Sequence, residues 1–228
     1  VLKFNHQLAR LKFFVRAGSE SAAGYKYEGS NWVERKSTDG QDKTLGMQVT
    51  KITLKDMVNV VDMDLATTTS ARNGASTAPF VVCSKDVDNK NKLDPDKGLI
   101  TPVVPKYPYG HENIPAEGDP DAKGTQVGEP VMFFPNGNIN LSIDLKQYVE
   151  DTKDETDGDK ITYKEVEKLD TPLIIDQSKI SKDVKEFKAG ASYNVYITIY
   201  GFEKIEVTAV LTAWEDGGDI ETDIEDGK

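Results

Sequence analysis

Residues 193–214 read YNVYITIYGFEKIEVTAVLTAW, and this stretch decides the fold class. Apolar side chains recur at every second position from Tyr193 to Ile199, and the alternation resumes at Ile205 after a break at 201–204. Successive side chains of a strand point to opposite faces, so each arm predicts a strand with one apolar face. The break contains Gly201 and has the length of a hairpin turn. An isolated hairpin is marginal in water, so the rest of the chain must cover its apolar face.

Similar alternation, or a short apolar run, predicts the strands that provide this cover. They are expected at 2–17, near 31–33, and at 47–54, 58–65, 80–83, 131–134, 139–145, 161–166 and 173–175. In the first of these the apolar parity changes between Leu8 and Ala9, which predicts a bulge or a passage between sheets. Polar segments at 18–46, 67–78 and 150–159 predict loops, and 176–188 predicts a helical turn. The chain is therefore expected to be all-β, with mostly antiparallel strands.

The charge of the chain excludes one class of partner. The 228 residues carry 28 Lys and Arg against 39 Asp and Glu, a net charge of −11, and seven of the acids lie at 215–228. Phosphate binding needs clustered basic residues, so we expect no nucleic-acid ligand. No apolar run approaches the length of a membrane-spanning helix. The sequence begins at Val1, so any signal peptide, lipid anchor or preceding domain would lie upstream of it.

Catalytic and metal-binding motifs are not recognisable. The two histidines, His6 and His111, lie in a strand pattern and in a loop without a partnering motif, and Cys83 lies in an apolar run. The acidic stretches 86–90 and 154–165 imitate calcium loops, but their spacing departs from the required ligand and glycine positions. We therefore expect no enzyme activity, no cofactor and no metal site.

The segment 84–130 holds seven of the ten prolines and is predicted to be a long surface-loop insertion that tolerates shortening. Within it, Tyr107, Tyr109 and His111 form a possible ligand-contact loop. These aromatic residues, with Trp32, are able to stack on a sugar or to pin the loops to the body. Exposed aromatic residues beside carboxylates or amides would favour sugar binding, whereas a loop packed onto the sheet would favour a scaffold.

Three blocks in this order resemble the fimbrillin family, the subunits of type V pili of Bacteroidales-type bacteria. The first is FNHQLARLKF at 4–13, similar to the strand that opens the second domain of the family. The second is VMFFP at 131–135 with the alternating strand that follows it. The third runs from FKAGASY at 187–193 to WEDG at 214–217, and resembles the entry and exit of the terminal hairpin.

The resemblance implies a transthyretin-like antiparallel β-sandwich of Greek-key type over 1–216, with 84–130 as an insertion and 217–228 as an acidic tail. It implies a lipoprotein exported to the cell surface and held at the outer membrane by a lipid signal upstream of this chain. Such subunits are not enzymes and assemble by donor-strand exchange, in which a neighbour's strand fills a groove. The implied partners are other pilus subunits, or a host or bacterial surface ligand.

The tail predicts the place of such a subunit in a fibre. A donor strand needs apolar side chains at alternate positions, and 215–228 offers only Ile220 and Ile224 among seven carboxylates. We therefore expect a tip, accessory or non-polymerising adhesin subunit rather than a stalk subunit. The alternative is a glycan-binding surface lipoprotein on the same fold, and an extracellular glycoside-cleaving enzyme ranks third.

Overall fold

The computed structural model describes residues 8–58, 61–64, 69–72, 77–84, 102–115, 119–135, 137–154, 160–180 and 186–212. Regular structure in these ranges consists of strands and two short 3-10 helices, η1 (Pro120–Lys123) and η2 (Gln177–Lys179). One four-stranded sheet has the order β12 (Lys204–Thr212), β11 (Ser192–Gly201), β1 (Ala9–Ala17) and β8 (Thr125–Phe133). The other has the order β10 (Lys160–Ile175), β9 (Ile139–Asp154), β4 (Gln48–Val58) and β7 (Thr77–Ser84). The protein is therefore all-β, as predicted.

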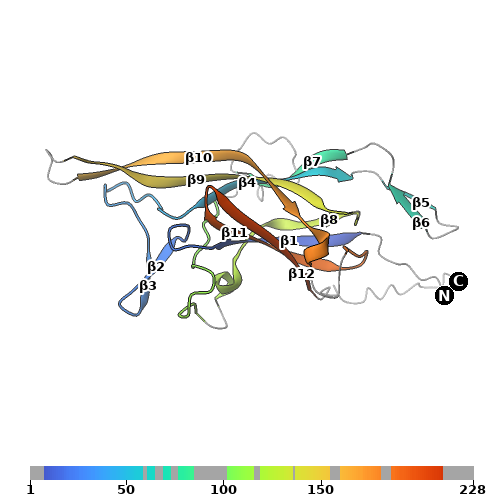
Figure 1. Ribbon diagram of the computed structural model, residues 1–228, viewed down its shortest axis with the longest axis horizontal. Coiled ribbons are helices and arrows are strands. Elements are labelled where there is room, and N and C mark those ends of the chain that lie inside the picture. The colour runs from blue at the N-terminus through green and yellow to red at the C-terminus, as the bar shows by residue number, and fades with distance from the viewer. Residues whose placement is uncertain are drawn as a thin grey trace, which may run out of the picture.

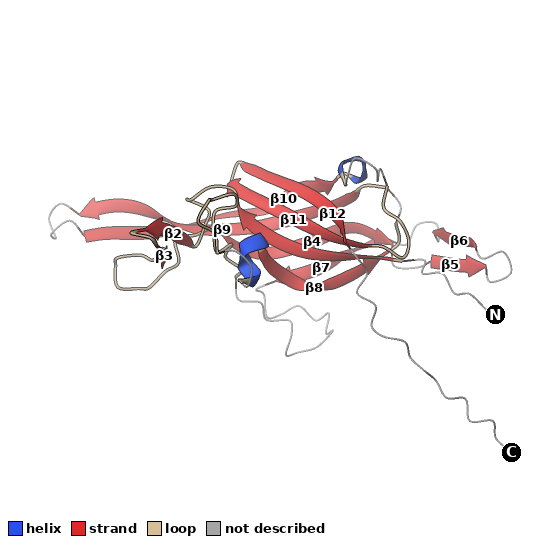
Figure 2. Ribbon diagram, turned by 90° about the horizontal axis from the view of Figure 1, so that it is seen from below, coloured by secondary structure: helices blue, strands red, loops and turns tan. Residues whose placement is uncertain are grey.

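Two small hairpins lie outside these sheets. They are β2 (Tyr25–Glu28) with β3 (Asn31–Glu34), and β5 (Val61–Asp64) with β6 (Thr69–Arg72). Figure 1 shows the two large sheets as two layers, with β2 and β3 at one end of the molecule and β5 and β6 at the other. Figure 2 shows that β9 and β10 run on beyond the other strands at the end where β2 and β3 lie.

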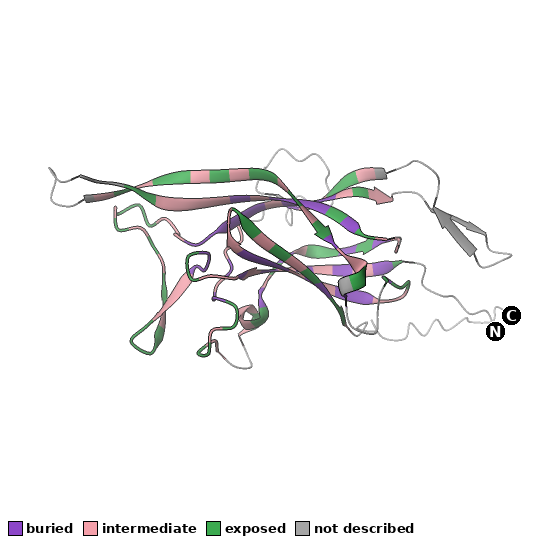
Figure 3. Cartoon of the chain, viewed as in Figure 1, coloured by how far each residue is buried: buried purple, intermediate pink, exposed green. Residues whose placement is uncertain are grey.

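The core lies between the two layers and consists of buried residues from both sheets, which Figure 3 colours purple. Burial alternates along the whole of β1, whose inward residues include the fully buried Leu11 and Phe13. Ile52 of β4 and Ile143 of β9 face them from the other layer and are equally buried. Each large apolar side chain buried in this way contributes about 1.5–3 kcal/mol. Burial of one face on every central strand is the reason for the two-layer arrangement.

The terminal hairpin is confirmed as β11 and β12, which pair antiparallel from Ser192 with Thr212 to Gly201 with Lys204. Tyr193, Val195, Ile197 and Ile199 are fully buried, so the predicted parity is correct. β11 also pairs with β1, and this pair is parallel, whereas every other strand pair of the described chain is antiparallel.

Several predicted breaks are bulges within longer strands. The segment 55–57 was expected to separate two strands, but β4 continues through it, with Asp56 at φ 52° and a register shift against β7. The short strands at 161–166 and 173–175 are one strand, β10, with a bulge at Asp170, φ 49°. Aspartate tolerates the left-handed region better than most residues, so the pairing resumes after two residues that have no direct partner.

Three further predictions are corrected at their boundaries. The segment 150–154, expected to be loop, belongs to β9, and 69–72, expected to be loop, forms β6. The segment 18–46 contains β2 as well as the expected strand near Trp32. The bulge or sheet change expected at Leu8 depends on residues 1–7, which lie outside the described residues, and a separate register shift lies on β8 opposite Leu11 and Phe13. The helical turn expected in 176–188 is present as η2.

The Pro-rich segment 84–130 is not loop throughout. β8 begins at Thr125, and Tyr107 is buried, so the C-terminal part of the segment belongs to the folded body. His6, the stretch 86–90 and the tail 217–228 lie outside the described residues.

Candidate functional site

An aromatic cluster lies at the end of the molecule where β2 and β3 project. Trp32 is its centre, with ring centroids 5.2 Å from Tyr27, 4.9 Å from Tyr107 and 5.0 Å from His111. Tyr25 lies 5.9 Å from Tyr107. The rings meet at tilted or edge-on angles, the arrangement that aromatic pairs prefer. We refer to these five residues as the aromatic cluster.

The β2–β3 hairpin supplies three of these rings because of its turn. Gly29 and Ser30 both have positive φ, 54° and 71°, as a two-residue type I′ turn requires. The turn sets the register that places Tyr27 directly opposite Trp32. Cross-strand aromatic pairs of this kind stabilise a hairpin that has no other strand beside it.

The segment 102–115 supplies the other two rings and is bonded to the hairpin and to β1. The indole Nε1 of Trp32 donates to the carbonyl of Asn113 at 2.9 Å, and the amide of Tyr25 donates to the carbonyl of Lys106 at 3.0 Å. The amide of Tyr109 donates to the carbonyl of Ala17 at 2.7 Å. These bonds, with the ring contacts of Trp32 to Tyr107 and His111, hold the segment against the hairpin and β1.

A polar network fixes the same segment to the start of β8. Asp119 caps η1 by accepting from the amide of Asp121 at 2.9 Å, and accepts from the Tyr107 hydroxyl at 2.6 Å and Lys106 Nζ at 3.0 Å. The Tyr107 hydroxyl and then the Asp121 amide lower the pKa of Asp119 to about 2. Burial and the Asp119 carboxylate raise the pKa of Tyr107. Asp119 is thus held ionised at neutral pH, so it accepts hydrogen bonds and does not act as a general acid.

A cavity of about 340 Å³ adjoins this network. The polar residues that line it include Glu34, Thr44, Lys106, Asp121 and Thr125, and Tyr25 and Val104 also line it. The hydroxyl of Thr125 is buried and has no hydrogen-bond partner in the described chain. A cavity of this size with several polar groups and one aromatic ring suits a small hydroxylated ligand.

The predicted ligand-contact residues do not form one site. Tyr107 and His111 belong to the aromatic cluster, and Tyr107 is 8% exposed. Tyr109 is 54% exposed and lies over Arg16 instead, with the guanidinium carbon 4.2 Å from its ring centroid. Sequence reasoning missed Tyr25 and Tyr27, although their alternation before a Gly-Ser turn was a usable signal.

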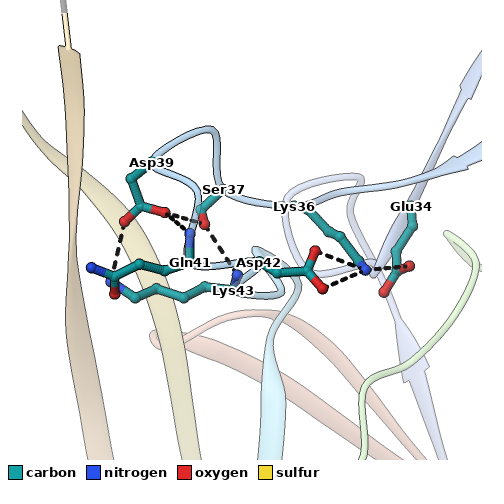
Figure 4. A network of polar contacts seen from close by, with 7 residues as sticks. All are labelled: Glu34, Lys36, Ser37, Asp39, Gln41, Asp42 and Lys43. Atoms are coloured by element: carbon teal, nitrogen blue, oxygen red, sulfur yellow. Dashed lines mark hydrogen bonds and ion pairs between the residues drawn. The ribbon is translucent and has the colours of Figure 1, made fainter.

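The acid-rich turn after β3 forms a closed set of charge pairs (Figure 4). Asp39 accepts from Ser37 Oγ at 2.6 Å and the Gln41 amide at 3.0 Å, and it pairs with Lys43 at 3.3 Å. Lys36 pairs with Asp42 at 2.8 Å and Glu34 at 3.4 Å. Hydrogen bonding from Ser37 lowers the pKa of Asp39, and Asp42 raises the pKa of Lys36. These carboxylates hold the turn together rather than converge on a shared point.

The two edge strands of the first sheet differ, and one of them is a second candidate site. On β8 the inward residues Val127, Val131 and Phe133 are buried. Gly128 there has φ 66°, and a Cβ added to it would lie 2.5 Å from the carbonyl oxygen of Val82 on β7. With a bulge, a proline and β7 close beside it, β8 is a protected edge.

β12 lacks the proline and the tightly packed glycine of β8, although β10 and η2 lie close to it. Its residues 205–212 pair in register with β11, with a shift only between Ile199 and Gly201 beside the turn, and its last five residues, 208–212, carry no charge. Leu211 has the inward parity but is 43% exposed, and the outward Val210 is 45% exposed. On β10, which belongs to the other layer, Leu169 and Ile174 are 64% and 57% exposed. An edge strand with exposed apolar residues is suited to pairing with an added strand.

Comparisons with protein-family models, with curated proteins and with solved structures found no match to this chain. Among the described residues, no helix is long and apolar enough to cross a membrane. Within the same residues, no group of three or more His, Cys, Asp or Glu side chains is arranged to hold a metal ion.

Proposed function

We propose that this protein is a non-enzymatic, fimbrillin-like subunit or adhesin of the cell surface, and that β12 pairs with a strand donated by a neighbouring pilus subunit. The observation that carries the proposal is the edge strand β12 with its exposed apolar residues Val210 and Leu211. A strand added there would extend the first sheet through main-chain hydrogen bonds, and its alternate apolar side chains would cover Leu211 and the half-buried Val207. The proposed occupant is an extended segment with apolar residues at every second position.

The strand order supports the finer fold in this proposal. The sheet order β12-β11-β1-β8 places the first long strand beside the seventh, and that pair is parallel. The order β10-β9-β4-β7 completes a second sheet of four. A transthyretin-like Greek-key sandwich has two such sheets with one parallel pair. The hairpins β2–β3 and β5–β6 are then additions to an eight-stranded body.

The acidic tail supports a tip or accessory place in the fibre. The proposed protein accepts a strand at β12, whereas 215–228 is a poor donor because its seven carboxylates oppose burial. Export as an outer-membrane lipoprotein, with its lipid signal upstream of Val1, is part of the same proposal.

The test is strand addition with a defined peptide. The probe is a nine-residue peptide with Val and Ile at alternate positions and Lys at both ends, which complements the acidic chain. Fluorescence anisotropy should show binding that Leu211→Lys weakens at least tenfold, because an inward lysine blocks an edge strand. Met132→Lys is the matched control, since Met132 is 44% exposed on the protected edge β8.

Two outcomes of this experiment would contradict the proposal. One is equal binding of a peptide with the same composition but with its apolar residues contiguous. The other is loss of binding in Met132→Lys with normal binding in Leu211→Lys.

A second candidate function, binding of a glycan at the cell surface, is favoured by the cavity beside the aromatic cluster. Its polar lining together with Tyr25 suits a sugar. Lys106→Ala should weaken binding of any oligosaccharide found to bind the wild-type protein, and an unchanged affinity would remove the cavity from consideration.

A further inference from the structure

Arg16 occupies an unusual place on the outer face of the first sheet, near the end of β1. Its guanidinium carbon lies 3.5 Å from the ring centroid of Tyr196 and 4.2 Å from that of Tyr109. Its Nε donates to the carbonyl of Lys123 at 2.6 Å. Phe14 stacks on Tyr196 with a centroid distance of 5.3 Å. The guanidinium is thus held in position by two aromatic rings and one backbone carbonyl.

No carboxylate among the described residues pairs with Arg16, in contrast to the lysines of the same chain. Described lysines paired with a carboxylate include Lys36, Lys43, Lys55, Lys106, Lys146, Lys164, Lys168 and Lys204. Burial lowers the pKa of Arg16. A half-buried cation without an anion is destabilised by its lost hydration. An arriving anion would offset that cost.

A guanidinium recognises a carboxylate through two parallel N–H···O bonds, which a lysine does not reproduce. The chain carries a net charge of −11, so it would repel a ligand with several negative charges, of which Arg16 could pair with only one. The complementary ligand therefore has a single anionic group on an otherwise neutral body. The turn that holds Arg16 also borders the polar cavity, through Asp121 and Thr125. That neighbourhood favours a hydroxylated ligand.

We propose that Arg16, flanked by Tyr109 and Tyr196, binds the carboxylate of an acidic saccharide. Arg16 receives the carboxylate, and the two rings fix the plane of the guanidinium. The exposed ring of Tyr109 forms the rim of the site. This inference deepens the glycan-binding candidate and is independent of strand donation, because the β12 edge is tested with a different probe and different variants.

The experiment compares matched probes by nuclear magnetic resonance titration of the full chain. Methyl glucuronide carries the carboxylate, methyl glucoside is its neutral twin, and an acetylated aspartyl amide presents a carboxylate on a peptide. We expect methyl glucuronide to shift the Arg16 Nε–H and the Tyr109 ring signals, with at least a tenfold preference over methyl glucoside. The preference should weaken as salt is raised, since it depends on a charge pair.

Variants assign the effect to Arg16. Arg16→Gln should abolish the preference, and Arg16→Lys should restore less than half of it, because the charge returns without the paired donors. Lys204→Gln is the matched control, since Lys204 lies 4.0 Å from the ring of Tyr200 on the same sheet but already pairs with Glu206. Tyr109→Ala tests the rim of the site, and near-ultraviolet circular dichroism checks that each variant is folded.

The proposal is overturned if methyl glucuronide does not bind or binds no better than methyl glucoside. It is equally overturned if the preference persists in Arg16→Gln, or if the aspartyl amide binds as tightly as the glucuronide. The last result would assign the site to an acidic peptide.

Discussion

The edge strands β8 and β12 end the same sheet in opposite ways. β8 has a bulge, a proline and a glycine packed against β7, and its inward side chains are buried. β12 pairs in register with β11 from Ile205 to Thr212, and its inward Leu211 remains 43% exposed. A lone β-sandwich protein protects its edges because an open one recruits other chains. The difference favours the proposed addition of a strand at β12 over addition at β8.

Truncation of an inward side chain should give the largest difference in unfolding free energy between the two edge strands. Phe133→Ala on β8 removes a buried ring that packs edge-on against Phe187, and should cost about 3–5 kcal/mol of unfolding free energy. Leu211→Ala on β12 should cost less than about 1 kcal/mol because its side chain is already partly in water. Urea denaturation of both variants measures the difference, and equal losses would mean that both edges are closed.

Glycine replacement tests the protection of β8 directly. Gly128→Ala forces a left-handed backbone on alanine, a strain of about 1–3 kcal/mol, and places a methyl group against the Val82 carbonyl. Gly201→Ala at the β11–β12 turn is the control, because no atom lies within 4 Å of its added Cβ. The melting temperature should fall only for Gly128→Ala. An unchanged value would show that β7 does not close this edge.

The network at the entry to β8 should contribute a smaller, pH-dependent amount. Asp119→Asn weakens the bonds from Tyr107 and Lys106 and should cost about 1–2 kcal/mol at pH 7. The folded pKa of about 2 lies below the ordinary value, so this stability is present above about pH 4 and is lost as pH falls towards 2. The gap between wild type and variant should therefore close over that range.

Asp42→Asn is the control for this measurement, since Asp42 is an exposed partner of Lys36 and should cost less than about 0.5 kcal/mol. A gap between wild type and Asp119→Asn that persists at pH 2 would remove Asp119 ionisation from the explanation.

Thiol labelling compares the two edge strands with the smallest expected effect on the stability of the protein. Burial raises the pKa of Cys83 to about 12, so its thiol on β7 should react with a thiol reagent only when the protected edge opens. A cysteine introduced by Thr208→Cys on β12, in a Cys83→Ser background, should react at the rate of a small thiol. Comparable rates at the two positions would contradict the difference between the edges.

The sequence predicted the faces of the strands well but not their continuity. A period of two reports which side chains are buried, and β1 and β11 follow it at every inward position. It does not report that Asp56 and Asp170 are bulges, because an aspartate between apolar runs is equally compatible with a turn. Two strands were therefore divided at positions where the pairing continues.

The candidate sites were harder to predict, since they depend on contacts between distant residues. Tyr107 and His111 were found from their loop, but their contact with Trp32 follows from the docking of 102–115 on a hairpin. Arg16 is an ordinary outward residue of a strand, and no sequence signal distinguishes it from Lys12. The protected and open edges likewise depend on which strands lie at the ends of the sheet, and alternation does not give that order.

Hydrogen exchange of the backbone amides tests the central claim most directly. In the protein alone, the β12 amides that face away from β11 should exchange rapidly. With the alternating Val and Ile peptide bound, those amides should become protected while the β8 amides remain unchanged, because main-chain bonds form only at the open edge. Protection that appears on β8, or peptide binding that leaves β12 exchange unchanged, would contradict the account.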